Sequence, residues 1–277
     1  MEVILSQAKA DNPAIRIAVA GTLVKYSGRK TINTLKKLAD DNVGHVRVEA
    51  LRSLGMVGDE SVVDIIDKYL DDEYSDVREA SLGALVLISG EKTINLFKND
   101  IESSDLQRKI MAVRGLGWIG EVQAIEILVD ALSHEEPEVR QHAVLGLSKA
   151  GYPGLEDNLT YLLTDENPEV RKAVIDAYLN ISGKDTGERI RILLADEDMW
   201  VRFYAINALA SIEDQGCLDK LLEIIPSQPP FVQVAILNLL SKIHDNKAVD
   251  ELRKLTESEN EDIRNAAMEA LESRSEF

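Results

Sequence analysis

Arginine recurs along this chain at intervals of 31 residues, and this interval constrains the fold more than any other feature of the sequence. The series contains Arg16, Arg47, Arg78, Arg140, Arg171, Arg202 and Arg264, and no insertion or deletion breaks it. Lys109 and Gln233 stand at its two remaining positions. A fixed period of this length is typical of a solenoid, in which one supersecondary unit stacks on copies of itself.

Each period predicts a pair of helices joined by a tight turn. In the unit from Asp41 to Asp71, apolar residues recur at spacings of three and four, which is typical of one buried stripe on a helix. This first stripe contains Val46, Ala50, Leu51, Leu54 and Val57. Gly58 and Asp59 then end the first helix and start a second, whose stripe contains Val62, Val63, Ile66, Tyr69 and Leu70. One such pair cannot bury its own apolar faces, so the copies must stack.

Prolines mark the start of the first helix in several units. Pro13, Pro137, Pro168 and Pro230 share one repeat position, which suits the first turn of a helix because the missing N–H would be unpaired there. We therefore predict an all-α fold, a right-handed α-solenoid of helix pairs with a 31-residue repeat. The array is expected to be single, with a half repeat over residues 1–9, eight full repeats over about 10–258, and a final helix over about 259–277.

Composition restricts the class of partner. The net charge of −18 argues against nucleic acid, which needs a basic footprint, and against an anionic membrane surface. The first residues lack the basic segment of a signal peptide, and no apolar run reaches the ~20 residues of a membrane span. Cys217 is the one cysteine and aligns with small residues of other repeats, so we expect it in the core. A cytoplasmic location is the default expectation.

The repeat resembles a known family. The strings Asn-Pro-Glu-Val-Arg-Lys-Ala at 167–173 and Glu-Pro-Glu-Val-Arg at 136–140, with glycine-containing turns such as Leu54–Gly58, resemble the short HEAT-like repeats of phycobilin lyase subunits and of many prokaryotic interaction proteins. The resemblance implies that second helices line the concave side. It also implies that each arginine pairs with an acidic residue in the preceding loop. That acidic position carries Asp41, Asp72, Asp165 and Asp196, but Ser103, His134, Ser227 and Ser258 elsewhere, where the ladder should be weaker.

Motifs for cofactors or metals carry little weight here. Gly115–Gly120 matches the glycine spacing of a dinucleotide loop, but the repeat places it at the end of a first helix, with no preceding strand. His134-Glu135 is a single pair, whereas hydroxylases resembling deoxyhypusine hydroxylase need several to hold two irons. We expect no cofactor, no metal and no catalytic residues.

The positions that depart from the repeat are the candidate partner-binding sites. The expected concave surface of second helices is acidic in its middle and carries two exposed apolar residues, so it suits a basic peptide or helix. Its residues are Glu126, Asp130, Asp157, Tyr161, Glu188 and Ile192. The alternative interpretation is an ordinary solvated face.

A second candidate is an apolar patch in the seventh and eighth repeats. Trp200 and Phe203 should touch because they are one helical turn apart, and Phe231 follows Trp200 by one repeat. Soluble proteins seldom expose such a patch without use. Local repacking around Pro229 and Pro230 is the alternative, since it would bury the rings.

These observations favour a non-enzymatic scaffold or adaptor that binds another protein on its concave surface. The alternative is a phycobilin lyase-like subunit acting on a tetrapyrrole or phycobiliprotein, as the resemblance allows. A third hypothesis, a HEAT-like DNA glycosylase, would need a basic concave face, and the acidic middle argues against it. The partner, the process and the oligomeric state stay open.

Overall fold

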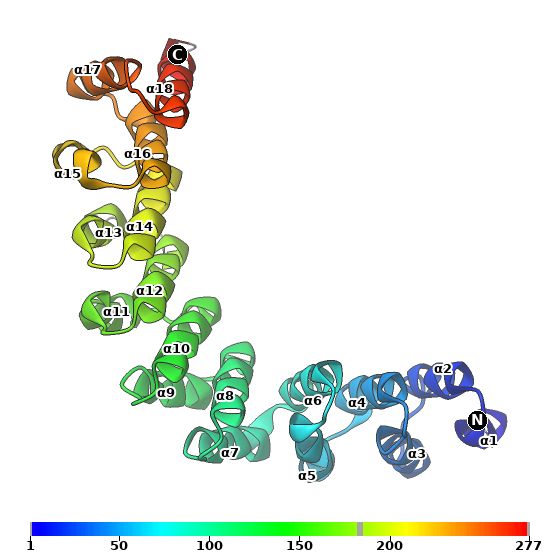
Figure 1. The fold of residues 1–277 in the computed structure, drawn as a ribbon. Helices are drawn as coiled ribbons and strands as arrows, with labels where there is room; N and C mark the ends of the chain where they lie inside the picture. Colours follow the sequence, from blue (N-terminus) through cyan, green and yellow to red (C-terminus); the bar gives the residue numbers. More distant parts are fainter. Residues whose placement is uncertain (1, 182–184, 276–277) are drawn as a thin grey trace. The chain divides into compact units, whose positions relative to one another are not determined.

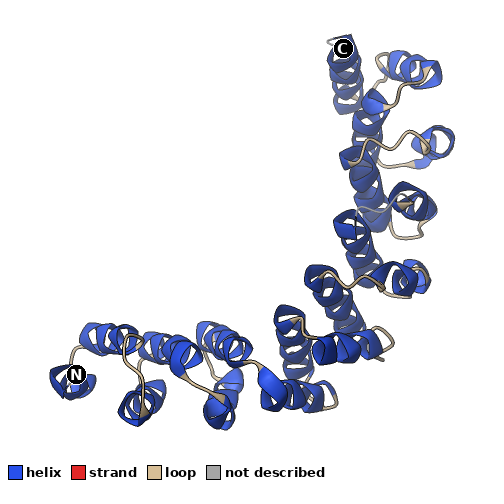
Figure 2. Cartoon of the chain, turned by 180° about the vertical axis from the view of Figure 1, so that it is seen from behind, coloured by secondary structure: helices blue, strands red, loops and turns tan. Residues whose placement is uncertain are grey.

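The computed structural model describes residues 2–181 and 185–275 and contains helices but no strand in those residues. The helices alternate between two layers (Figures 1 and 2). Contacts divide the chain into two compact units, which are Met1–Glu135, called unit 1, and Glu136–Phe277, called unit 2. The fold is an all-α solenoid, as the period predicts.

The first helices of successive repeats begin at intervals of 31 residues. In unit 1 they are α2 (Pro13–Leu23), α4 (Gly44–Val57), α6 (Ser75–Ile88) and α8 (Leu106–Ile119). In unit 2 they are α10 (Pro137–Ala150), α12 (Pro168–Ile181), α14 (Met199–Ser211), α16 (Pro230–Lys242) and α18 (Glu261–Ser275). The prolines of the shared position start α2, α10, α12 and α16, as the sequence predicts.

The second helices are less regular. Continuous ones are α3 (Arg29–Ala39), α7 (Gly90–Ile101), α9 (Val122–Ala131) and α17 (Asn246–Leu255). Shorter ones are α1 (Glu2–Ser6), α5 (Val63–Ile66), α11 (Leu155–Leu159), α13 (Thr186–Arg191) and α15 (Leu218–Ile224). Each shorter helix runs into a 3₁₀ segment: η1 (Gln7–Lys9), η3 (Asp67–Asp71), η4 (Tyr161–Thr164), η5 (Ile192–Ala195) and η6 (Ile225–Ser227). A further segment, η2 (Glu60–Val62), precedes α5. The tighter turn lets these repeats end their second helix abruptly.

Small residues let neighbouring first helices approach closely. Gly55 of α4 lies against Ala84 of α6, and a Cβ added to Gly55 would lie 2.6 Å from the Ala84 Cα. Gly115 of α8 faces Phe97 of the second helix α7, whose ring lies 2.5 Å from where its Cβ would be, and Leu82 of the first helix α6, whose side chain lies 3.0 Å from it. Leu51 and Leu54 are fully buried beside this contact. The core is therefore built from close helix contacts and aliphatic side chains.

The arginine series forms a ladder that joins consecutive repeats. The Arg171 guanidinium donates to both carboxylate oxygens of Asp196 at 2.7 Å and to the Asp165 carbonyl. Bidentate pairs of the same kind join Arg16 to Asp41, Arg47 to Asp72 and Arg140 to Asp165. Hydrogen bonding by Arg16 lowers the pKa of Asp41 below its usual value.

The partner loop of this ladder differs from the expectation. Arg47 and Arg171 each pair with the aspartate of the following loop, 25 residues later, and donate to a backbone carbonyl of the preceding loop. Arg78 has serine at the following position and binds the carbonyls of Asp72 and Glu73 instead. Arg202 uses the side-chain oxygen of Gln228 at 2.9 Å. The expectation of a carboxylate in the preceding loop was wrong, because the long arginine side chain crosses to the next repeat.

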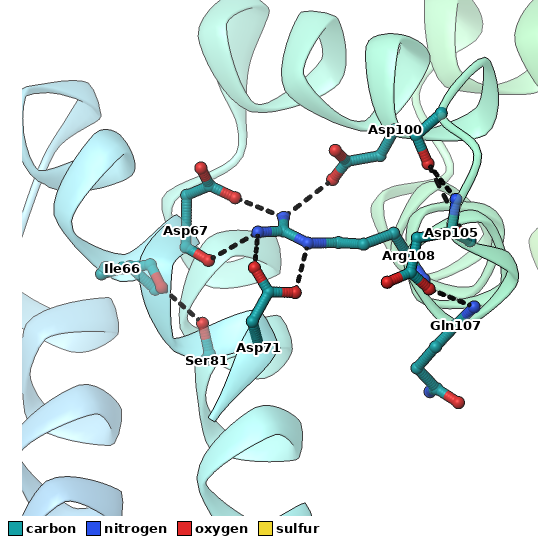
Figure 3. A network of polar contacts seen from close by, with 9 residues as sticks. Ile66, Asp67, Asp71, Ser81, Asp100, Asp105, Gln107 and Arg108 are labelled. Atoms are coloured by element: carbon teal, nitrogen blue, oxygen red, sulfur yellow. Dashed lines mark hydrogen bonds and ion pairs between the residues drawn. The ribbon is translucent and has the colours of Figure 1, made fainter. Parts of the chain in front are cut away.

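Arg108, which precedes Lys109 of the arginine series, makes a separate set of contacts in the fourth repeat. Its guanidinium reaches back to Asp67 at 2.5 Å and Asp71 at 2.6 Å, and to Asp100 at 3.2 Å, so it joins η3, α7 and α8 (Figure 3). Burial raises the pKa of Asp100 to about 6, against the effect of Arg108 and with a contribution from Asp67. One cation thus holds three carboxylates in unit 1.

No helix in the described residues combines the length and apolar character needed to cross a bilayer. Cys217 is 1% exposed, and burial raises the pKa of its thiol to about 12. The cysteine therefore belongs to the core, as expected from its repeat position.

Candidate protein-binding surfaces

The two layers of helices give each unit two broad surfaces. We call the outer face of the second helices the second-helix surface, and the outer face of the first helices the first-helix surface. The sequence predicts candidates on both, and the structure places every one of these residues.

On the second-helix surface, all six predicted residues are exposed. In unit 1, Glu126 and Asp130 lie on α9. In unit 2, Asp157 lies on α11 and Glu188 on α13, while Tyr161 and Ile192 begin η4 and η5 with 49% and 57% of their surface exposed. The surface of unit 2 is not uniformly acidic, because Arg189 donates to the Thr160 hydroxyl at 3.0 Å between these acids. Partner binding there stays a prediction.

On the first-helix surface of unit 2, three aromatic rings gather between α14 and α16. The ring centroids lie 6.0 Å apart for Trp200 and Phe203, 5.3 Å for Trp200 and Phe231, and 5.5 Å for Phe203 and Phe231. These separations suit favourable aromatic contacts. Trp200 is nevertheless 50% exposed and Phe231 39%, so the neighbouring prolines do not bury the rings.

Local capping positions this cluster. Asp198 caps α14 by accepting hydrogen bonds from the backbone N–H groups of Trp200 and Val201. Pro230 starts α16 immediately before Phe231. The two exposed rings, Trp200 and Phe231, therefore lie in the first turns of α14 and α16, where the Asp198 cap and Pro230 fix the backbone.

Beside the rings lies a groove of about 830 Å³, which continues across α16 to α18. Successive repeats supply equivalent positions to it, so its character changes along its length. Phe203, Val234 and Asn265 occupy one such position, and Asn207, Asn238 and Glu269 another. The α14 end is thus aromatic and the α18 end polar, with amide groups between.

The α18 end of the groove is negatively charged. Asp262 and Glu269 line it, both exposed, and neither forms an ion pair with another described residue. Asn207, which lines the groove, donates its side-chain N–H to the Phe203 carbonyl at 2.8 Å, and its amide oxygen accepts no hydrogen bond from another described residue. An apolar anchor followed by a cation is the chemistry that complements this surface.

A family model for HEAT repeats matches residues 1–86, 91–178, 156–239 and 186–272. The chain belongs to the HEAT-repeat family. No curated protein matches it.

Solved structures share this HEAT-repeat fold. The E. coli protein YibA is 17% identical with a TM-score of 0.57, over 94% of this chain and 96% of YibA. Kap121p, in a structure bound to the extreme C-terminus of the protein phosphatase Cdc14p, is 13% identical with a TM-score of 0.62, over 99% of this chain and 38% of Kap121p. Kap95p, in a structure with RanGDP, is 14% identical with a TM-score of 0.61, over 99% of this chain and 46% of that chain. At these identities the likeness concerns the fold.

The motifs considered for chemistry are parts of the HEAT-repeat framework. Gly115 and Gly117 are buried within α8, and Gly120 ends that helix with a φ of 64°, so the glycines serve helix packing and capping. Among the described residues, no three His, Cys, Asp or Glu side chains are placed to hold a metal ion. Cys217 hydrogen-bonds the Asp214 carbonyl from within the core.

Sequence reasoning missed the acidic end of the groove. Asp262 follows Phe231 by one repeat, and Glu269 follows Asn238 by one repeat. Aligning the last helix with the preceding repeats identifies both residues from the sequence. The alignment of the repeats carries this signal, because the last helix continues the repeat positions of Phe231 and Asn238.

Proposed function

We propose that this HEAT-repeat chain is a non-catalytic scaffold that binds a protein partner through the groove of α14, α16 and α18, which we call the aromatic groove. Its partner is a peptide segment or helix with an apolar anchor and a basic residue beyond it. The anchor packs against Phe203 and Phe231, and the basic residue approaches Asp262 and Glu269.

The observation that carries this proposal is a cluster of three mutually contacting rings, two of them exposed (Trp200 and Phe231), beside a groove of about 830 Å³. Exposed aromatic clusters that adjoin a cavity are typical of interface anchors. Kap121p, which has the same fold, binds the extreme C-terminus of Cdc14p. A pre-ordered row of helices can offer such a segment a surface without reorganising.

The second-helix surface, with Tyr161 and Ile192, is the alternative site for the same scaffold function. It carries exposed apolar side chains, but among its described residues no rings are in contact with one another. The lyase-like alternative finds less support, because the thiol of Cys217 is buried and its pKa is raised to about 12. A thiol in that state is a poor nucleophile at neutral pH.

Selection from a random peptide library displayed on phage tests the proposal. We expect peptides that pair an aromatic or aliphatic residue with lysine or arginine, and binding that falls about tenfold or more in Phe231→Ala. Tyr161→Ala is the matched control, because it removes an exposed ring from the other surface and should leave affinity unchanged.

The reverse pattern, with binding lost in Tyr161→Ala and kept in Phe231→Ala, would move the site to the second-helix surface. Circular dichroism of both variants checks that they remain folded. The substituted rings are exposed, so little change in helicity is expected.

A further inference from the structure

A second apolar surface lies in unit 1, on the first-helix surface, and nothing in the proposed function uses it. Met56, Leu87 and Trp118 occupy the same repeat position at the ends of α4, α6 and α8. Their exposed fractions are 63%, 61% and 39%. We call these three residues the unit 1 stripe. A space of about 420 Å³ adjoins it and is lined also by Arg52, Gly83 and Glu79.

The stripe is confined to these repeats. The same position carries Lys25 in the preceding repeat, and later repeats have lysine, asparagine or serine there. Three large apolar side chains at consecutive copies of a position that is otherwise polar form a contiguous patch, which soluble proteins seldom expose without use.

Gly83 forms the floor of this space. The flanking repeats carry Arg52 and Arg114 at the repeat position of Gly83, but a Cβ added at Gly83 would meet no atom within 4 Å. Gly83 therefore leaves a recess in the middle of the stripe, between two basic residues. Glycine is not required there by the backbone, since its φ is not in the left-handed region.

One edge of the stripe is formed by the repeat position of Arg52, Gly83 and Arg114. This edge is basic, although the chain carries −18 overall. Arg52 on this edge is exposed, as is Lys25 at the stripe position of the preceding repeat, and neither forms an ion pair with another described residue. Arg114 lies 5.3 Å from the Trp118 ring and pairs with both carboxylate oxygens of Glu79, so the charges of these two residues offset each other and Arg52 supplies the net positive charge of this edge.

The spacing of the stripe selects an α-helical occupant. Packed helices lie about 8–10 Å apart, so successive stripe residues are separated by about that distance. Residues seven apart on an α-helix lie on one face and about 10.5 Å apart. An extended strand places same-face residues about 7 or 13 Å apart and does not match. Polyproline segments also place same-face residues about 9 Å apart, but they dock between aromatic rings, and this stripe has one ring.

We infer that the unit 1 stripe is a docking site for an amphipathic helix of a partner protein. That helix carries apolar side chains at heptad spacing and acidic side chains along the edge that faces Arg52. The apolar side chains pack on Met56, Leu87 and Trp118, and one of them enters the recess above Gly83. This inference is independent of the aromatic groove.

A displayed library of helix-forming peptides about three heptads long tests it, with apolar residues fixed at heptad spacing and the flanking positions randomised. The full chain is the target. We expect enrichment of aspartate and glutamate on one edge, and a selected peptide whose affinity falls about tenfold in Met56→Ser/Leu87→Ser. Val122→Ser is the matched control, because Val122 is an equally exposed apolar residue of unit 1 on α9.

Two further variants separate docking from folding. Gly83→Gln fills the recess with a side chain that meets no obstacle, so it should weaken binding severalfold while helicity is kept or increased. Arg52→Glu should weaken the acidic peptide severalfold at low salt and have little effect on its glutamine analogue.

Several outcomes would overturn the inference. They are a library that yields no saturable binder, enrichment of lysine and arginine, stronger binding of proline-rich peptides, or undiminished binding in Met56→Ser/Leu87→Ser. Concentration-dependent self-association that Met56→Ser/Leu87→Ser abolishes would also overturn it, because the stripe would then join copies of this chain. Loss of binding in Phe231→Ala, by contrast, bears only on the aromatic groove.

Discussion

Single residues at one repeat position differ in energetic importance, and the arginine ladder demonstrates this. Arg171 is 4% exposed and holds Asp196 in a bidentate pair, whereas Arg78 is partly exposed and binds only backbone carbonyls. A buried pair leaves an uncompensated charge when one partner is removed. The sequence period is the same at both positions, so only the partner decides the contribution.

We predict that Arg171→Leu lowers the free energy of unfolding by about 3–5 kcal/mol, because Asp196 then stays buried without its cation. Arg78→Leu is the matched control and should cost about 1–2 kcal/mol, since it loses hydrogen bonds to carbonyls alone. Urea unfolding followed by circular dichroism measures both. Equal losses in the two variants would contradict the account of the ladder.

The Arg108 cluster predicts a pH dependence. Asp100 has a usual pKa of 3.8 and a folded pKa of about 6, so the folded state binds more protons between these values. Stability from this group is therefore greatest at low pH and falls as pH rises from about 4 to about 6. Arg108, Asp67 and Asp71 are the charged groups that face it.

Asp100→Asn stays neutral, so its stability relative to the natural chain should rise by on the order of 2 kcal/mol between about pH 4 and pH 7. Urea midpoints at a series of pH values test this, with Asp76→Asn, an exposed residue, as the control. A constant difference across that range would show that Asp100 does not titrate as its burial requires.

At the scale of elements, helix packing depends on which glycines face a neighbouring helix. Gly55 faces the backbone of α6 at close range, whereas Gly83 faces open space. Both lie inside first helices, where glycine weakens the helix relative to alanine. Packing opposes this preference at Gly55 and not at Gly83.

Gly55→Ala should therefore destabilise the chain by about 1–3 kcal/mol, because α4 and α6 must separate. Gly83→Ala should stabilise it by about 0.5–1 kcal/mol through helix propensity. Thermal and urea unfolding of the two variants provide the comparison. Stabilisation by both would mean that α4 and α6 are not in the close contact described.

Much of the fold could be predicted from the sequence, because the period locates the start of every first helix. The 3₁₀ endings of the second helices could not, since they depend on how each loop closes. The direction of the ladder was also missed: the period locates Arg47 and Asp72 but not which loop the side chain reaches. For the sites, Trp200 and Phe231 are aromatic at a repeat position where the two preceding repeats carry glutamate, so the sequence alone identifies them. Met56, Leu87 and Trp118 can be recognised only when their exposure is known.

At the scale of the whole molecule, charge governs encounter with a partner. The chain carries −18 and attracts a basic segment before contact, and salt screens this attraction. Apolar packing in the aromatic groove, in contrast, acts after contact. Charge therefore affects mainly the association rate constant, and apolar packing affects mainly the dissociation rate constant.

For a basic peptide selected on the aromatic groove, we predict that raising salt from about 0.01 to 0.15 M lowers the association rate constant about tenfold and leaves dissociation nearly unchanged. Phe231→Ala should do the opposite and mainly speed dissociation. Surface plasmon resonance resolves the two rates. A salt effect confined to dissociation would contradict this division.

Hydrogen–deuterium exchange of the full chain with and without that peptide tests the central claim most directly. The account predicts slower exchange in the first turns and exposed faces of residues 199–211, 230–242 and 261–275, which line the aromatic groove. Residues 155–164 and 186–195 should be unaffected. Protection confined to those second-helix segments would contradict the account and locate the partner on the other surface.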